Sequence, residues 1–281
     1  MKQPENKTPP PRLKPVGQCI YCGETNGLSD EHIIPLGLRG TLILPKSSCK
    51  QCADLTSAIE GRVLRGFMQS ARLVANFPSR RKKSRPKVLR TRLITEHDNV
   101  VEQDIPVDEA AALLTLPILA PASMLSGQAP TYGVKFAGAE TIHFGKKIDT
   151  LLHERDAAAM EINTQVHLSD FVKMLAKIAY GYCVATNGLF PRDQSPLLPL
   201  LRGEADDGSC WIGSSDYKLQ IESAGNTHVL GGYLLRRADN VETTVIRVKL
   251  FADAGATGYE VITRAIGWQQ YALPRQVATR E

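Results

Sequence analysis

The order of apolar and polar positions predicts a β-hairpin followed by a long helix near the N-terminus. Apolar residues dominate the stretch 28–44, and Gly37 and Gly40 are placed to form its bend. From about residue 53 to residue 76 the apolar positions recur with a period of about 3.6, which is typical of a helix with one buried face. We expect this helix to break near Gly66 and to end before Pro78.

Beyond this helix the pattern alternates between strands, helices and loops. The stretch 108–114 predicts a short helix, and Ser169-Asp170 can cap a longer one whose apolar side chains, from Phe171 to Tyr182, form a stripe. The fold class that follows is α+β, with the topology of the C-terminal part open. We expect strands at 87–94, 131–144, 159–167, 211–222, 228–236, 243–251 and 259–266, and loops at 79–86, 117–130 and 190–209.

Length and composition favour two domains. The 281 residues are 43% hydrophobic, which is enough for a packed core. We expect a disordered leader at 1–14, one domain at 15–92 and another at 93–281. The leader is polar and proline-rich, without the apolar centre of a signal peptide, and the sequence lacks an apolar run long enough to span a membrane. These features predict a cytoplasmic protein with reduced thiols.

Positive charge is concentrated in one part of the chain. Residues 61–92 contain eleven Lys or Arg and no acidic residue, whereas residues 93–281 contain 16 basic and 23 acidic residues. A dense basic cluster neutralises phosphates and releases their counterions, which is how proteins gain most of their affinity for nucleic acid. The charge distribution therefore predicts a nucleic-acid contact in the N-terminal third and argues against one in the acidic part.

Four cysteines form two C-x-x-C pairs, Cys19 with Cys22 and Cys49 with Cys52, separated by 26 residues. Four thiolates in two such pairs can close a tetrahedral zinc site, and closed sites of this kind are structural. The separation leaves room for the predicted hairpin between the pairs. Two further cysteines lie outside this pattern. We expect Cys183 and Cys210 to be buried free thiols, with a disulfide between them as the less favoured alternative.

The predicted hairpin carries an acidic residue followed by a histidine, Glu31-His32, in the segment EHIIP. A histidine held beside a rigid metal scaffold is where a general base is expected. The alternative is a structural one, in which the His32 side chain braces the hairpin through a hydrogen bond. No other histidine has metal-ligand spacing, and no phosphate-binding glycine motif is present.

The stretch 19–65 resembles the HNH endonuclease family, in particular its members with two zinc knuckles around an EHIIP hairpin. The matching segments are CIYCG at 19–23, EHIIPLGL at 31–38, LPKSSCKQCADLTSAIEGRVLRG at 44–66 and the basic PSRRKKSRP at 78–86. Together they cover about a quarter of the chain. The resemblance implies a zinc-stapled ββα-metal module, treble-clef-like in form, that hydrolyses DNA phosphodiester bonds.

The resemblance also implies roles for individual residues. His32 would take a proton from water, and Glu31 would bind a catalytic Mg²⁺ or Mn²⁺ ion. Many members place Asn or His directly after the last knuckle cysteine, but here that position is Ala53, which cannot coordinate a metal. Glu60 is the favoured replacement, as a ligand or as a carboxylate behind one, with Asp54 as the other candidate.

Two details of this assignment stay open. Glu60 lies almost two helical turns beyond Ala53, roughly 10 Å along the axis, so a direct ligand role needs the hairpin to lean toward the later turn. The other interpretation of Glu60 is a surface ion pair with Lys50, Arg62 or Arg65. The central Asn of many HNH hairpins has no clear counterpart, and Ser47 or Ser48 could satisfy the same backbone groups.

The basic residues that follow the second knuckle are candidates for contact with the nucleic-acid backbone. Because no pattern of aromatic residues accompanies them, we expect phosphate contacts with weak sequence preference. The alternative is a solvated charged surface. The candidates are Arg62, Arg65, Arg72, Arg80, Arg81, Lys82, Lys83, Arg85 and Lys87.

The sequence supports more than one function. The first is a metal-dependent DNA endonuclease with structural zinc. The second is a zinc-dependent DNA-binding module without catalysis, which Ala53 and the missing Asn favour, and the third is a nuclease that acts on RNA. The C-terminal part could sense a signal, bind a protein partner or form a homodimer, and no membrane partner is expected.

Overall fold

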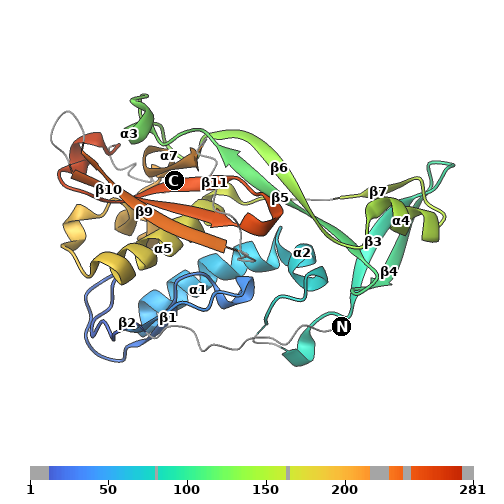
Figure 1. Ribbon diagram of the computed structural model, residues 1–281, viewed down its shortest axis with the longest axis horizontal. Coiled ribbons are helices and arrows are strands. Elements are labelled where there is room, and N and C mark those ends of the chain that lie inside the picture. Colours follow the sequence, from blue (N-terminus) through green and yellow to red (C-terminus); the bar gives the residue numbers. More distant parts are fainter. Residues whose placement is uncertain (1–12, 80–81, 163–164, 216–227, 237–241, 274–281) are drawn as a thin grey trace, which may run out of the picture.

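The computed structural model describes residues 13–79, 82–162, 165–215, 228–236 and 242–273, so the expected leader lies outside the described residues apart from Leu13 and Lys14. The fold is mixed α+β, as expected. Its centre is the helix α5, Leu168–Asn187 (Figure 1). Twelve residues of α5 are buried, because one side of the helix packs on the N-terminal module and the other on a four-stranded sheet.

The N-terminal module consists of two antiparallel strands and a helix, in the predicted order. Glu31 pairs with Leu44 and His32 with Ile43 across the hairpin, and the chain turns between the strands through a short 3₁₀ helix. The long helix breaks at Gly66 as expected, but it begins at Lys50, three residues before the predicted start. The elements are β1 Ser29–His32, η1 Leu36–Leu38, β2 Ile43–Ser48, α1 Lys50–Arg65 and α2 Gln69–Val74.

The C-terminal strands form one antiparallel sheet in the order β8-β11-β10-β9. The predicted strands at 228–236, 243–251 and 259–266 are confirmed to within one residue. Of the stretch predicted at 211–222, residues 212–215 form a strand and 216–222 lie outside the described residues. Val245, Val248 and Val261 are fully buried, so the sheet covers α5 with an apolar face. The strands are β8 Ile212–Ser215, β9 His228–Arg236, β10 Glu242–Leu250 and β11 Gly258–Ala265.

A long hairpin, β5 Ala111–Leu119 and β6 Phe136–Gly145, runs from the main body toward a smaller sheet (Figure 1). The prediction of a helix at 108–114 was wrong. Local alanine and leucine content favours a helix there, but the residues from Ala111 onward pair with β6. Pro117 belongs to β5 and not to a loop, and a proline fits because this two-stranded sheet leaves an edge that needs no N–H donor.

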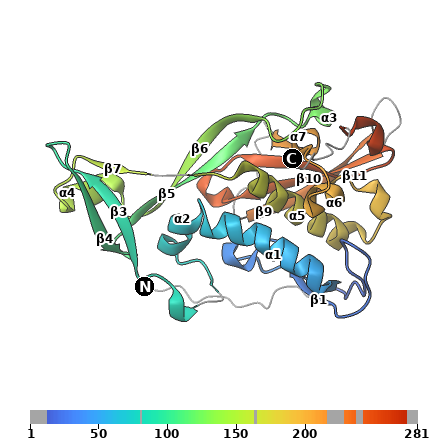
Figure 2. The same ribbon diagram turned by 180° about the vertical axis from the view of Figure 1, so that it is seen from behind.

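The smaller sheet has the strand order β4-β3-β7 and a helix, α4, beside it (Figure 2). It has its own small cluster of buried residues, which includes Ile105 and Leu151. Arginines of β3 form ion pairs with acidic residues of the neighbouring strands. One of these pairs joins Arg92 to Glu161 at 2.6 Å. The elements are β3 Val88–Ile94, β4 Val100–Pro106, α4 Ile148–Glu154 and β7 Ala159–Glu161.

Short helices occupy stretches that were predicted as loops. The stretch 190–209 contains α6, whose five apolar residues are buried against α5, and the first two residues of α7. The helices are α3 Ser123–Ser126, α6 Leu197–Arg202 and α7 Gly208–Trp211, with 3₁₀ turns η2 Lys82–Ser84, η3 Arg192–Gln194, η4 Ala252–Ala254 and η5 Trp268–Tyr271. Within the described part of the chain, no helix has the length and apolarity needed to cross a membrane.

The N-terminal module and the C-terminal part share one hydrophobic core. A single cluster of buried residues extends from Cys19 to Ala265, and the expected boundary after residue 92 falls inside β3. Helix α5 makes the connection. Arg62 of α1 donates two hydrogen bonds to Asp170 at 2.7 Å, so Asp170 forms an ion pair here instead of capping α5. Tyr180 donates to the Ile20 carbonyl at 2.8 Å.

His228 links the sheet to the hairpin. The backbone N–H of Phe251 donates to Nδ1 of His228, which leaves Nε2 to donate to the Leu38 carbonyl at 2.6 Å. Burial lowers the pKa of His228 below its ordinary value. The neutral ring is therefore the form that the folded chain favours.

We expect the free energy of unfolding to fall as the pH decreases below about 6.5, the ordinary pKa of histidine, because the unfolded chain then takes up a proton that folded His228 resists. Denaturant titrations at about pH 7.5 and 5.5 measure this loss. The loss should be smaller in His228→Phe and unchanged in His143→Phe, which alters an exposed residue of β6. Equal losses in all three proteins would contradict this role of His228.

Candidate zinc centre and adjacent cleft

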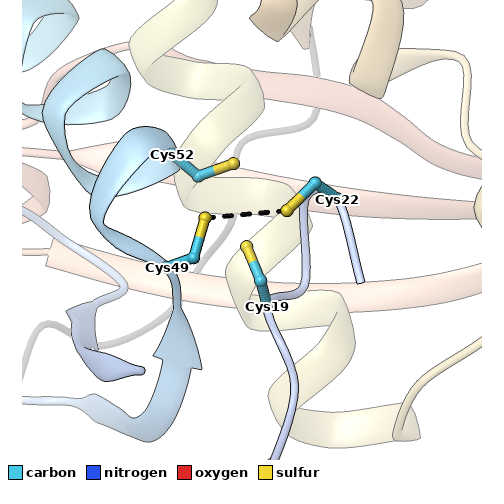
Figure 3. A group of neighbouring side chains, drawn as sticks. All are labelled: Cys19, Cys22, Cys49 and Cys52. Atoms are coloured by element: carbon cyan, nitrogen blue, oxygen red, sulfur yellow. Dashed lines mark hydrogen bonds between the residues drawn. The ribbon is translucent and has the colours of Figure 1, made fainter. Parts of the chain in front are cut away.

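The four cysteines of the two pairs converge at the start of α1 (Figure 3). Their Sγ atoms all lie within 4.8 Å of one another, and those of Cys22 and Cys49 are 3.6 Å apart. Four thiolates at about 2.3 Å from a zinc ion lie about 3.8 Å from each other, so the spacing suits zinc and is too wide for a disulfide. The residues therefore fit the expected structural zinc ion.

Local backbone structure explains this arrangement. Cys49 is the N-cap of α1 and Cys52 lies in its first turn, so the positive end of the helix dipole faces the sulfurs. Burial raises the pKa of Cys19, but backbone N–H groups of Cys49, Cys22 and Tyr21 outweigh it and lower the pKa. Burial raises the pKa of Cys52. Zinc would lower the pKa values of all four thiols by binding the thiolate form.

A cleft of about 440 Å³ opens between the hairpin and α1. Glu31 and His32 line it from β1, and Ala53 and Glu60 line it from α1. Ala53 and Glu60 therefore face the same side of the helix. The cleft brings together the three residues that the sequence assigned to catalysis, His32, Glu31 and Glu60.

The two carboxylates of this cleft hold a lysine that the sequence did not single out. Lys177 of α5 places its Nζ atom 2.7 Å from Oε1 of Glu31 and 2.8 Å from Oε1 of Glu60. Its ammonium also donates to the backbone carbonyl of His32 and, at 3.3 Å, to that of Ile33. The side chain is 1% exposed. Burial lowers the pKa of Lys177, but Glu31 and Glu60 more than offset this, so the pKa lies above its ordinary value.

Other polar side chains of the module have local partners. Asp54 pairs with Lys50 at 2.6 Å on the exposed side of α1, and Asp30 accepts the backbone N–H of Lys46. Ser47 is buried and donates to the Leu44 carbonyl at 2.8 Å, which satisfies a backbone group of the hairpin. Asp54 is therefore held away from Glu31, and Glu60 is the carboxylate that α1 contributes.

The basic residues divide into exposed ones and ones engaged by the protein. Arg65 is exposed and lines the cleft. Lys83 and Lys87 are also exposed. In contrast, Arg72 donates to the carbonyls of Gly37, Leu64 and Pro78, Arg85 to those of Phe77, Arg72 and Leu73, and Arg62 binds Asp170.

These contacts change the interpretation of three candidate residues. Arg62, Arg72 and Arg85 use their guanidinium groups to join segments of the chain, so each has a structural task that sequence reasoning did not foresee. Arg80 and Arg81 lie outside the described residues, and only the backbone of Lys82 is described. Two of the predicted basic residues, Arg65 and Arg72, line the cleft, and of these two Arg65 is the exposed one.

A weak signal of Lys177 is present in the sequence. It lies in LAKIAYGYC, an otherwise apolar stretch of a helix that is buried on most sides. A lysine in such a position needs a buried anionic partner. The sequence did not show that the partners are Glu31 and Glu60, which precede it by more than a hundred residues.

Comparison of the chain with protein-family models, with curated proteins and with solved structures gives no match. The site is therefore interpreted from its own residues. Within the described parts of the chain, the four cysteines are also the only group of three or more His, Cys, Asp or Glu side chains placed to share a metal ion.

We expect the purified protein to contain about one zinc ion per chain, since four thiolates close a single tetrahedral site. Cys49→Ser should lose the zinc and unfold at lower denaturant concentration, because metal binding contributes folding energy to so small a module. Cys210→Ser, which alters a buried cysteine outside the pairs, should keep the zinc. Atomic emission measures the zinc content of the wild type and of the two variants, and a denaturant titration measures their unfolding. Full zinc content in Cys49→Ser would refute the site.

Proposed function

We propose that the chain is an HNH-type endonuclease that hydrolyses DNA phosphodiester bonds, with His32 as the general base. The observation that carries the proposal is the cleft, which is lined by His32 and Glu31 of the hairpin and by Glu60 of α1. The hairpin is flanked by the four-cysteine centre. The strand–strand–helix order of β1, β2 and α1 also agrees with the ββα module that the sequence resembles. A pocket of this kind, with converging titratable groups, is where an active site is expected.

The chemistry assigned to the residues is in-line hydrolysis. His32 takes one proton from a water molecule, whose oxygen attacks the phosphorus atom. The bond between phosphorus and the 3′ oxygen breaks, which leaves a 5′-phosphate on one product, and the 3′ oxygen takes a proton from solvent. The backbone carbonyl of His32 is fixed by Lys177, so the base is attached to a rigid part of the hairpin.

The substrate preference follows from charge. Arg65 lies at the cleft with an exposed guanidinium, and Lys83 and Lys87 are exposed on the segment that follows. Cations at these positions attract a polyanionic backbone and offset the charge that develops on the phosphate. They read no base edges, so we propose binding that is mainly to phosphates, in DNA before RNA because the family resemblance is to DNA nucleases.

The expected Mg²⁺ or Mn²⁺ ion does not fit between Glu31 and Glu60 as they are placed here. An ammonium already lies between the two Oε1 atoms, at hydrogen-bond distances of 2.7 and 2.8 Å. Magnesium needs oxygens at about 2.0–2.1 Å in near-octahedral geometry. The assignment of Glu31 and Glu60 as ligands of a catalytic ion is therefore not carried into the mechanism.

A second candidate is a zinc-dependent DNA-binding module without catalysis. The ion pair of Lys177 with Glu31 and Glu60 favours it, because the two carboxylates then have a structural task, and Ala53 supplies no ligand in their place. The two candidates share the zinc centre and the basic residues. They differ only in whether the bound DNA is cut.

We expect purified protein to nick or linearise supercoiled plasmid when Mg²⁺ and Mn²⁺ are both supplied, and His32→Ala to lose this activity by about a hundredfold or more, as for loss of a general base. His97→Ala, which alters an exposed histidine, is the matched control and should cut normally. Gel electrophoresis measures the products. Plasmid that is shifted but never cut would support the binding module, and activity that survives in His32→Ala would contradict the assigned base.

We expect Arg65→Ala to weaken DNA binding and to reduce the slope of log affinity against log salt by about 0.9, the amount for one phosphate contact. Arg90→Ala is the matched control, since Arg90 is an arginine of the smaller sheet that pairs with Glu102 and Asp104. Fluorescence anisotropy with a labelled duplex at several salt concentrations measures both. An unchanged slope in Arg65→Ala would mean that this side chain does not contact phosphate.

A further inference from the structure

Lys177 occupies the position at which a cation would bind the two carboxylates of the cleft. An ammonium has three donors. Here they face Glu31 at 2.7 Å, Glu60 at 2.8 Å and the carbonyl of His32, with the Ile33 carbonyl at 3.3 Å. Carboxylate and carbonyl oxygens are also the donors that hard divalent cations prefer. The lysine therefore uses the same oxygens that a metal ion would use.

The lysine is held in this position by the core of the protein. Its neighbours on α5, Ala176 and Ile178, are fully buried, and the helix packs on α1 and on β10 and β11. The side chain itself is 1% exposed. Because α5 is the central helix and its neighbours are buried, the packing of the core holds the ammonium against the carboxylates.

The charge of Lys177 also argues against a divalent cation at Glu31 and Glu60. One ammonium between two carboxylates leaves a net charge of −1 in a buried cluster. A divalent ion on the same oxygens would lie about 4 Å from the lysine, and like charges at that distance repel strongly where solvent is excluded. In addition, no third His, Cys, Asp or Glu of the described chain is placed to share a metal ion with the pair.

We propose that the Lys177 ammonium takes the place of the divalent cation at this hairpin, so that Glu31 and Glu60 are held together by a positioning lysine of the C-terminal part. The inference concerns the same cleft as the proposed function and extends it. If the chain cuts DNA, it does so without Mg²⁺ or Mn²⁺ at Glu31 and Glu60. Lys177 then also couples the C-terminal part to His32, through the backbone carbonyl that it binds.

The test is a titration of the zinc-loaded full chain with Mn²⁺, in which electron paramagnetic resonance measures how much Mn²⁺ is bound. Thiolate sites select zinc over Mn²⁺, so the cysteine centre does not interfere. We expect wild type to bind no more Mn²⁺ than Glu60→Gln. Lys177→Met frees the two carboxylates and should bind Mn²⁺ at least about tenfold more tightly than wild type, because a unit charge next to the ion is removed. Lys173→Met, one turn earlier on α5, should behave as wild type.

Two results would overturn the proposal. One is a Mn²⁺ site in wild type that is lost in Glu60→Gln. The other is a folded Lys177→Met that gains no Mn²⁺ affinity, with folding judged by circular dichroism. If Lys177→Met does not fold, the comparison of wild type with Glu60→Gln still tests the proposal. Both of these proteins keep Lys177, so this comparison does not depend on the folding of the lysine variant.

Failure of the proposed function is detected separately. Plasmid cleavage by wild type is repeated with no added divalent ion. Cleavage that requires Mg²⁺ or Mn²⁺ bound at Glu60 would sustain the nuclease and overturn the role of Lys177. Absence of cleavage under every condition would contradict the proposed nuclease function. The Mn²⁺ measurement would still test whether Lys177 takes the place of the divalent cation.

Discussion

The contact between Lys177 and the two carboxylates Glu31 and Glu60 is the constraint on which the arrangement of the molecule depends. It joins α5 to both the hairpin and α1 at one buried point. Removal of one partner from a buried ion pair typically costs about 3–5 kcal/mol, because the other charge is left without compensation. The contact thus specifies how the N-terminal module sits on the rest of the chain, and it also determines what the cleft can bind.

The cysteine centre and α5 support the hairpin from two sides. The cysteines fix the loops at both ends of the hairpin and the start of α1, while Tyr180 donates to the Ile20 carbonyl within the first knuckle. His228 binds the Leu38 carbonyl at the turn. A module of this size has too little core to hold such a loop alone. Its shape in this protein therefore depends on the cysteine centre, which a zinc ion would complete, and on the C-terminal part together.

Local sequence patterns correctly predicted the features that depend on residues close to one another in the sequence. The cysteine spacing, the hairpin and the break of the helix at Gly66 are confirmed, since each depends on residues close in sequence. The prediction at 108–114 failed because local helix preference is weak compared with pairing to β6, whose residues follow some thirty positions later. The hydrogen bonds of Arg72 and Arg85 to backbone carbonyls were likewise not predicted, since basic side chains in a sequence give no sign of which carbonyls they reach.

The sequence by itself determined the donor types of the cysteine centre, because these follow from residue chemistry and short spacings. The candidate roles of Glu31, His32 and Glu60 came from the family resemblance of the same stretch. Only the tertiary structure decided what those carboxylates bind. Lys177 follows Glu60 by more than a hundred residues, and no periodicity or motif connects them. A buried charge finds its partner through packing, and packing depends on the whole fold.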